Sequence, residues 1–181
     1  MASPRPLTGE PLPLDLVNTE WNAGGAPQDL LADAAGWRAW LAEHDELPDR
    51  LPPAARNALL EARAAIRATL EDAPGARKQL NAVLAHGHVV HRLGPHGPEE
   101  AVEVDDPAWE PAWRAAHAFL ELLADRPERV RGCANPECVL FFLDVSKPGT
   151  RRWCSMAGCG NRLKARRHHA ARGDDQPVSA A

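Results

Sequence analysis

The sequence predicts an α+β protein in two parts, a mainly helical N-terminal domain with a small β-hairpin and a short cysteine-containing C-terminal module. Three observations lead to this prediction. Apolar residues recur at helical spacing over much of residues 29–125, β-branched residues cluster between residues 87 and 106, and all four cysteines lie in the last third of the 181 residues. Such a chain is long enough for one good hydrophobic core and a small additional module.

The first half of the chain predicts three helices after a short apolar segment and a turn. The apolar segment spans residues 7–19, and Gly24-Gly25 marks the turn. Proline is tolerated in a first helical turn and Pro-Gly interrupts a helix, which gives the boundaries of the second helix. The expected helices span residues 29–47, with Leu30, Ala34, Trp37 and Leu41 on one face, residues 52–70, with Leu59, Ala62, Ile66 and Leu70 inward, and residues 76–86.

The next segment predicts a β-hairpin and then a fourth helix. Residues 88–93 and 101–104 have the composition of short strands, and Gly-Pro-His-Gly-Pro at residues 94–98 predicts the loop between them. Asp106 is the expected N-cap of a helix that begins at Pro107. The apolar stripe of that helix comprises Trp109, Trp113, Ala116, Leu120 and Leu123. This helix is expected to complete a domain over residues 1–125.

The cysteines form two close pairs, Cys133 with Cys138 and Cys154 with Cys159, separated by 15 residues. Two such pairs predict one structural Zn²⁺ ion held by four thiolates, because four cysteines complete a tetrahedron and leave no position for a reacting water. Two disulfides or a redox-active dithiol are the alternatives. Neither is favoured, since the N-terminal sequence has no apolar run of signal-peptide length and both spacers contain four residues.

Residues 126–172 are expected to fold as a treble-clef-like zinc finger. The predicted order is a tight knuckle at the first cysteine pair, a strand over residues 139–145, a second strand over residues 150–153 and a helix capped by Ser155. The ligand pairs would then lie in the knuckle and at the start of the helix. Because this segment contains few apolar residues, metal binding is expected to provide its folding free energy. Residues 173–181 are small and polar and are expected to form a disordered tail.

The charge of the chain is divided at the same boundary. Residues 126–172 contain 11 Lys and Arg against 3 acidic residues, whereas residues 1–125 contain 10 against 20. An acidic body joined to a basic module favours an anionic partner for the module, and DNA is the expected one. The candidate phosphate contacts are Arg151, Arg152, Arg162, Lys164, Arg166 and Arg167. A solvated charged face is the alternative for these residues, and RNA is an alternative target.

The sixteen residues from Arg151 to Arg166, with the sequence Arg-Arg-Trp-Cys-Ser-Met-Ala-Gly-Cys-Gly-Asn-Arg-Leu-Lys-Ala-Arg, resemble the CGNR-type zinc finger. In that family the finger follows an N-terminal domain named ABATE, and Leu-Asp-Leu-Val-Asn-Thr at residues 14–19 is similar to a motif near the start of that domain. The resemblance implies a bacterial transcription regulator proposed to act in the stress response. It implies zinc ligation by all four cysteines and brings no catalytic residues.

Other classes of function are less favoured. No Ser/His/Asp or paired-carboxylate arrangement stands out, so an enzyme is not expected. No segment approaches the roughly 18 consecutive apolar residues of a membrane span, and a cytoplasmic protein is expected. A single finger offers a small footprint, so specific binding is expected to need a homodimer or a partner protein. Ligand or protein binding by the N-terminal domain is the alternative function, with candidate pocket residues Trp21, Trp37, Trp40, Trp109, Trp113, His86, His88, His91 and His96.

Overall fold

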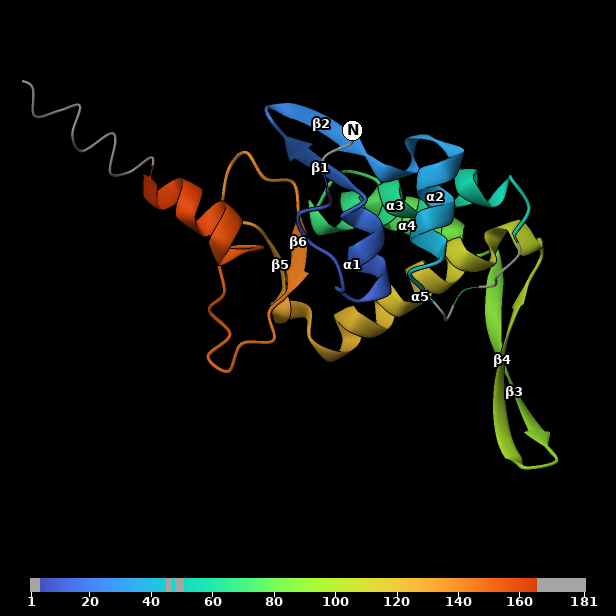
Figure 1. Ribbon diagram of the computed structural model, residues 1–181. Helices are drawn as coiled ribbons and strands as arrows, with labels where there is room; N and C mark the ends of the chain where they lie inside the picture. Colours follow the sequence, from blue (N-terminus) through green and yellow to red (C-terminus); the bar gives the residue numbers. More distant parts are fainter. Residues whose placement is uncertain (1–3, 45–46, 48–50, 166–181) are drawn as a thin grey trace, which may run out of the picture.

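The computed structural model describes residues 4–44, 47 and 51–165. Figure 1 shows a helical body with a small finger at one end and a long β-ribbon at the other. The α+β class expected from the sequence is confirmed. In the described residues every β-sheet is a two-stranded antiparallel pair, so the fold is organised by helix packing rather than by a central sheet.

The elements follow the chain in three groups. The body contains α1 (Leu12–Val17), β1 (Glu20–Ala23), β2 (Ala26–Asp29), the 3₁₀ turn η1 (Leu30–Ala32), α2 (Ala34–Leu41), α3 (Ala55–Leu70), α4 (Ala76–Leu84) and α5 (Glu110–Asp125). The ribbon consists of β3 (Gly87–Gly94) and β4 (Gly97–Val104), and η2 (Pro107–Trp109) connects it to α5. The finger contains η3 (Pro127–Arg129), β5 (Val130–Gly132), β6 (Phe141–Leu143) and the π-helical turn η4 (Met156–Gly160), from which a helix continues to residue 165.

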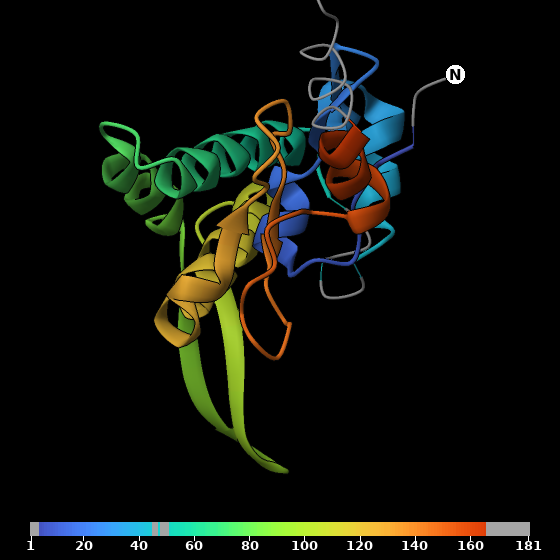
Figure 2. The ribbon, with the colours of Figure 1, turned by 90° about the vertical axis from the view of Figure 1, so that its left-hand side faces the viewer.

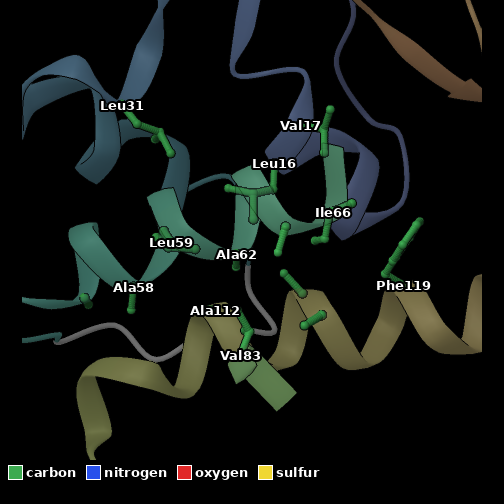
Figure 3. Close-up of a cluster of buried hydrophobic side chains, with 14 of the residues drawn as sticks. Leu16, Val17, Leu31, Ala58, Leu59, Ala62, Ile66, Val83, Ala112 and Phe119 are labelled. Carbon is green, nitrogen blue, oxygen red and sulfur yellow. The ribbon is translucent and has the colours of Figure 1, made fainter. Parts of the chain in front are cut away.

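The main hydrophobic core lies where α1, α3 and α5 meet (Figure 3). Leu16 of α1, Leu59 and Ile66 of α3, and Phe119 of α5 are completely buried there. The stripe predicted for α3 is therefore confirmed as an inward face. The stripe predicted for α5 is only partly correct, because Trp113 and Ala116 are buried but Leu120 is 41% exposed, and Phe119 is buried in its place. Alanines such as Ala62 also lie on these faces, and their small side chains let the helices approach closely, as in ridge-into-groove packing.

The helix expected over residues 29–47 is divided in the structure. The Asp29 carboxylate caps η1 by accepting a hydrogen bond from Leu31 N (2.8 Å), and the Asp33 carboxylate caps α2 by accepting from Ala35 N (2.9 Å) and Gly36 N (2.8 Å). Two N-caps four residues apart end one element and begin the next, so the apolar spacing across them does not belong to a single helix. The prediction of one continuous helix is wrong.

A short hairpin, β1–β2, precedes that region and was not expected as a pair of strands. Its turn is the Gly24-Gly25 pair, and both glycines have positive φ values of +60° and +82°. Glycine is favoured in this conformation because it has no Cβ. The flanking residues show no regular alternation of apolar and polar side chains, so the sequence predicts the turn and not the strands.

The ribbon β3–β4 confirms the predicted hairpin and is longer than expected. Gly94 pairs with Gly97, which leaves a two-residue turn in place of the predicted five-residue loop. Figures 1 and 2 both show the ribbon extending away from the helical body. Asp106 caps the next turn as predicted, accepting a hydrogen bond from Ala108 N at 2.8 Å.

The strand pairing within the finger differs from the prediction. Strand β6 pairs with β5, upstream of the first cysteine, and residues 150–153 form no strand. The buried Asp144 carboxylate explains this arrangement. It accepts hydrogen bonds from Ser146 N and Arg151 N, both at 2.9 Å, and so closes residues 144–151 into a loop rather than a hairpin turn.

Candidate zinc centre and its basic surface

The four cysteines converge on one point of the finger. Their Sγ atoms all lie within 4.8 Å of one another, including 3.8 Å between Cys138 and Cys154 and 3.5 Å between Cys154 and Cys159. A tetrahedral zinc ion with Zn–S bonds of about 2.3 Å requires S···S separations of roughly 3.8 Å. The arrangement therefore fits one Zn²⁺ ion with four thiolate ligands, which is a closed, structural site.

Local turns place each ligand pair. Cys138 N donates a 2.8 Å hydrogen bond to the carbonyl of Asn135, which forms the knuckle between Cys133 and Cys138. The Ser155 hydroxyl accepts from Gly158 N (3.2 Å) and caps the π-helical turn that carries Cys159, as predicted. Each pair is thus fixed by contacts within its own turn, and the metal joins the two turns.

The sulfur atoms also accept hydrogen bonds from neighbouring N–H groups. Asn135 Nδ2 lies 3.4 Å from the Sγ of Cys159, Cys154 N lies 3.4 Å from the Sγ of Cys133, and Arg162 Nη2 lies 3.6 Å from the Sγ of Cys159. Such contacts stabilise the negative charge that thiolate ligands bring to a zinc site and orient the ligands.

The thiols affect one another's ionisation strongly. Hydrogen bonds from Cys138 and Cys154 lower the pKa of Cys133 to about 2, whereas the hydrogen bond with Cys133 raises the pKa of Cys138 to about 12. The pKa of Cys154 is also raised, chiefly by its contact with Cys133. Thiolates this close repel one another, so a divalent cation is required to keep all four ionised together.

A second hydrophobic cluster surrounds the metal ligands and includes part of the N-terminal domain. Trp21 of β1 is buried together with Leu140, Phe142, Cys154 and Cys159. The indole of Trp21 is therefore a component of the core of the finger, although it lies more than 100 residues upstream of the first ligand. Zinc binding and the β1–β2 hairpin depend on the same packed residues.

Two side chains from the first 18 residues bind the backbone of β6. The buried Asn18 amide donates to the Phe141 carbonyl (2.8 Å) and accepts from Phe141 N (2.9 Å), so it pairs with β6 as a further strand residue would. The Glu10 carboxylate accepts from Leu143 N at 2.8 Å. We call this pair of contacts the Asn18 clasp. The clasp satisfies the free edge of β6, which would otherwise be exposed in a two-stranded pair.

The predicted phosphate contacts fall into three classes in the structure. Arg151 is engaged inside the finger, with its guanidinium donating to the carbonyls of Trp153 (3.0 Å) and Cys154 (2.6 Å) and stacking 4.2 Å above the ring of Phe142. Because these bonds occupy Arg151 Nε and Nη2, few of its N–H groups remain available to contact a phosphate. Arg166 and Arg167 lie outside the described residues, as do residues 173–181 of the expected tail.

The remaining three, Arg152, Arg162 and Lys164, are exposed on the finger. None of them forms an ion pair with a carboxylate anywhere in residues 4–44, 47 and 51–165. Arg152 lies over the Trp153 ring, with its guanidinium carbon 5.2 Å from the ring centroid. These three cations, which we call the basic surface, carry the charge available to an external anion.

The tryptophan and histidine residues considered for a pocket do not form one site, although two of them, His86 and Trp109, line the same cavity of about 330 Å³. Trp37, Trp40 and Trp113 are core residues, while His88 and His91 lie on the exposed ribbon opposite glutamates. His86 stacks on Trp109 with ring centroids 3.6 Å apart. Of this set, only Trp21 lines a cavity next to the finger. That cavity has a volume of about 460 Å³ and is lined by Glu20, Trp21, Asn22, Pro27, Gln28, Asp29, Arg67, Glu71 and Val139.

Three residues important for the site were not identified from the sequence: Asn18, Asn135 and Asp144. The Asn-Pro pair in the first cysteine spacer indicates a turn, and it could have identified Asn135 as a buried hydrogen-bonding residue. Asn18 lies within the Leu-Asp-Leu-Val-Asn-Thr motif, but its partner Phe141 is 123 residues away. No local pattern predicts a contact of that range.

Comparison with known families gives two matches. The family of CGNR zinc fingers matches residues 129–172, and the ABATE family, described as a "putative stress-induced transcription regulator", matches residues 10–126. The second match alone covers more than half of the chain. No curated protein is similar enough in sequence to count as a match. Among the described residues, no helix has the length and apolar character needed to cross a membrane.

Proposed function

Since the chain belongs to the ABATE family and carries a CGNR zinc finger, we propose that it is a zinc-dependent transcription regulator that contacts DNA through the finger. The observation that carries this proposal is the basic surface, where Arg152, Arg162 and Lys164 are exposed beside the thiolate cluster. A rigid metal centre holds these cations on one small, stable unit, which is the arrangement that phosphate contacts require.

The partners of the other arginines support the same assignment. In the acidic body, the guanidinium groups of Arg5, Arg63 and Arg67 each form an ion pair with a carboxylate, with N···O distances of 3.3 Å or less. The cations of the basic surface form no such ion pair with a carboxylate of the described residues, so their charge is available to a phosphate. Arg166 and Arg167 extend the same basic sequence and are included in the proposed contact surface. The contribution of Arg151 is then mainly structural, because its donors are engaged within the finger.

Salt dependence tests the proposal directly. If about five cations neutralise phosphates, the logarithm of affinity for duplex DNA should fall against the logarithm of salt concentration with a slope near −4.5. Replacing Arg152, Arg162 and Lys164 with alanine together should reduce the magnitude of the slope by about 2.7, measured by fluorescence anisotropy. The double variant Arg77→Ala/Lys78→Ala, which removes two exposed cations of α4, should leave the slope unchanged.

Two results would contradict the proposal. A wild-type affinity that does not change with salt would exclude phosphate contacts, and a triple variant with the wild-type slope would exclude the basic surface. The same titration with single-stranded and duplex RNA shows whether the finger prefers DNA or RNA. Tighter binding to RNA than to duplex DNA at every salt concentration would assign the finger to RNA.

Ligand sensing is the second candidate function, and the cavity beside Trp21 favours it. The cavity is bounded by β1, β2 and α3 of the body and by Val139 of the finger. Arg67 connects its two sides, because its Nη1 donates to the Val139 carbonyl at 3.0 Å. A small molecule bound there would contact both the helical body and the finger. Its binding would change the stability of the contact between these two parts of the chain.

A screen of small metabolites by thermal unfolding of the full-length chain tests this second function. A ligand at 100 times its dissociation constant should stabilise the protein by about 2.7 kcal/mol. Gln28→Trp, which places a large side chain into the cavity, should abolish the stabilisation, whereas Asn57→Trp on the exposed face of α3 should preserve it. A ligand that stabilises both variants equally binds elsewhere, and that result would exclude this cavity.

A further inference from the structure

The indole N–H of Trp21 is a buried hydrogen-bond donor that has no acceptor within residues 4–44, 47 and 51–165. Trp21 is 4% exposed, so it is shielded from bulk water as well. The buried indole of Trp40 donates to the Asp15 carboxylate at 2.9 Å. The buried indole of Trp113 donates to the Leu84 carbonyl at 3.0 Å. Because a buried indole N–H normally has such a partner, the exception at Trp21 requires an explanation.

Arg67 holds a second donor of this kind. Its Nε lies 3.3 Å from a carboxylate oxygen of Glu20, which is an ion-pair distance, but it makes no hydrogen bond in the described part of the chain. The two Nη atoms donate to the carbonyls of Val139 (3.0 Å) and Val17 (2.9 Å). Trp21 and Arg67 both line the cavity of about 460 Å³ beside the finger. That cavity is therefore suited to a ligand that brings a hydrogen-bond acceptor, such as a carbonyl oxygen.

The charges around the cavity disfavour an anionic ligand. Glu20, Asp29 and Glu71 all line it. Arg63 pairs with the first two, at 3.0 Å and 2.6 Å, and Arg67 pairs with Glu20 and, at 3.6 Å, with Glu71. Three carboxylates thus share two guanidinium groups, and Glu71 is the least neutralised of the three. This excess of negative charge favours a ligand with a cationic group that lies near Glu71.

The remaining wall of the cavity is apolar and adjoins the metal site. Pro27 and Val139 line the cavity together with Trp21. Trp21 also packs in one cluster with the metal ligands Cys154 and Cys159. A ligand with an apolar body would therefore contact a side chain that supports the zinc centre.

We propose that this cavity binds a small apolar molecule that carries both a carbonyl oxygen and an amine, as the amide of an apolar amino acid does. The carbonyl oxygen accepts a hydrogen bond from the Trp21 indole, with Arg67 Nε available as a second donor. The ammonium group faces Glu71, and the apolar body lies against Pro27 and Val139. This inference rests on ligand sensing as the second candidate function and adds the chemical class of the ligand.

Binding in this way requires the Gln28 side chain to move. Gln28 lies directly opposite Trp21 in the β1–β2 register, so the two side chains share one face of the hairpin. The Gln28 amide donates a local, exposed hydrogen bond to the Pro27 carbonyl at 3.0 Å. Breaking such a bond costs little, because water replaces the lost partner. Rotation of Gln28 is the movement that opens the buried indole N–H to the ligand.

Two-dimensional ¹H–¹⁵N NMR of the full-length, zinc-loaded chain tests the proposal without DNA. The probe is phenylalaninamide, for which a dissociation constant of about 1 mM is expected from its size. Its binding should move the assigned indole proton signal of Trp21 downfield, as a new hydrogen bond does. Phenethylamine, which lacks the carbonyl, and N-acetylphenylalanine, which is an anion, should each bind at least about tenfold more weakly.

Three variants locate the ligand within the cavity. Gln28→Trp should abolish the movement of the Trp21 signal, whereas Asn57→Trp on the exposed face of α3 should preserve it. Glu71→Gln should weaken binding of phenylalaninamide at least about threefold, since it removes the carboxylate that faces the ammonium group. The same variant should leave binding of N-acetylphenylalaninamide, which has no ammonium group, within about twofold of the wild type.

The outcomes separate this inference from ligand sensing itself. A Trp21 signal that stays in place with every probe up to about 10 mM would overturn the proposal, since a molecule of this size should bind below that concentration. N-acetylphenylalanine that binds as tightly as phenylalaninamide would also overturn it. If a metabolite from the thermal screen requires the cavity but leaves the Trp21 signal unmoved, ligand sensing holds and the ligand class assigned here is wrong.

Discussion

A Cys154→Ser variant is expected to lose its zinc ion and, with it, the structure of the finger. The Cys154 side chain is almost completely buried and lies within 3.8 Å of the sulfur atoms of Cys138 and Cys159. Apparent binding free energies for structural zinc are about 10–16 kcal/mol, which is comparable to the total stability of a typical domain. Elemental analysis should therefore find about one zinc ion per chain in the wild type and almost none in the variant.

The consequences should extend beyond the finger in a defined pattern. Trp21 packs against Cys154 and Cys159, so hydrogen exchange should accelerate in the β1–β2 hairpin as well as in residues 130–160. The core of α3 and α5 is built around Leu59, Ile66 and Phe119 and contains none of the metal ligands. Amides of these two helices should keep most of their protection.

A nearby substitution and a chemical treatment serve as controls for this prediction. Met156→Ser changes an exposed residue of the same π-helical turn and should retain zinc and wild-type exchange. Removing zinc from the wild type with a chelator should reproduce the exchange pattern of Cys154→Ser, and adding zinc should reverse it. An unchanged finger in the metal-free protein would show that packing alone is sufficient and that the metal does not determine the fold.

The sequence was informative where a signal is local. The zinc ligands follow from two short spacers, and the two long helices α3 and α5 follow from apolar residues at three- and four-residue spacing. The division of the expected helix at residues 29–47 also had a local signal, since Asp29 and Asp33 are both good N-cap residues. The apolar residues on both sides of Asp33 keep helical spacing, and this spacing led to the prediction of a single helix.

The sequence was uninformative where a buried polar side chain decides how short strands pair, and where a contact spans a long distance in the chain. The partner of β6 could not be predicted because strands of three residues have no distinctive pattern, and because the decisive contact is the hydrogen bonding of the buried Asp144. The position of Trp21 beside the cysteines could not be predicted either, because it depends on how the β1–β2 hairpin packs against the finger. Arg151 illustrates the converse case. Its charge suggested a phosphate contact, but the structure places its guanidinium against backbone carbonyls of the finger.

The Asn18 clasp predicts the second large effect, a loss of stability in Asn18→Ala. Asn18 is completely buried, and its side chain makes both hydrogen bonds to the backbone of Phe141. Without it, the N–H and the carbonyl of Phe141, which are partly buried in β6, lose their partners. Each unsatisfied group costs about 1–3 kcal/mol, so urea unfolding should show a loss of about 2–6 kcal/mol.

Asn22→Ala is the matched control for this prediction, because Asn22 is exposed and donates a single hydrogen bond to the Glu137 carbonyl at 2.9 Å. It should cost no more than about 1 kcal/mol. Both variants retain all four cysteines, so both should still bind one zinc ion, which separates loss of the clasp from loss of the metal. If Asn18→Ala unfolds at the same urea concentration as Asn22→Ala, the edge of β6 is held by the metal and the surrounding side chains, and Asn18 does not couple the finger to the helical body.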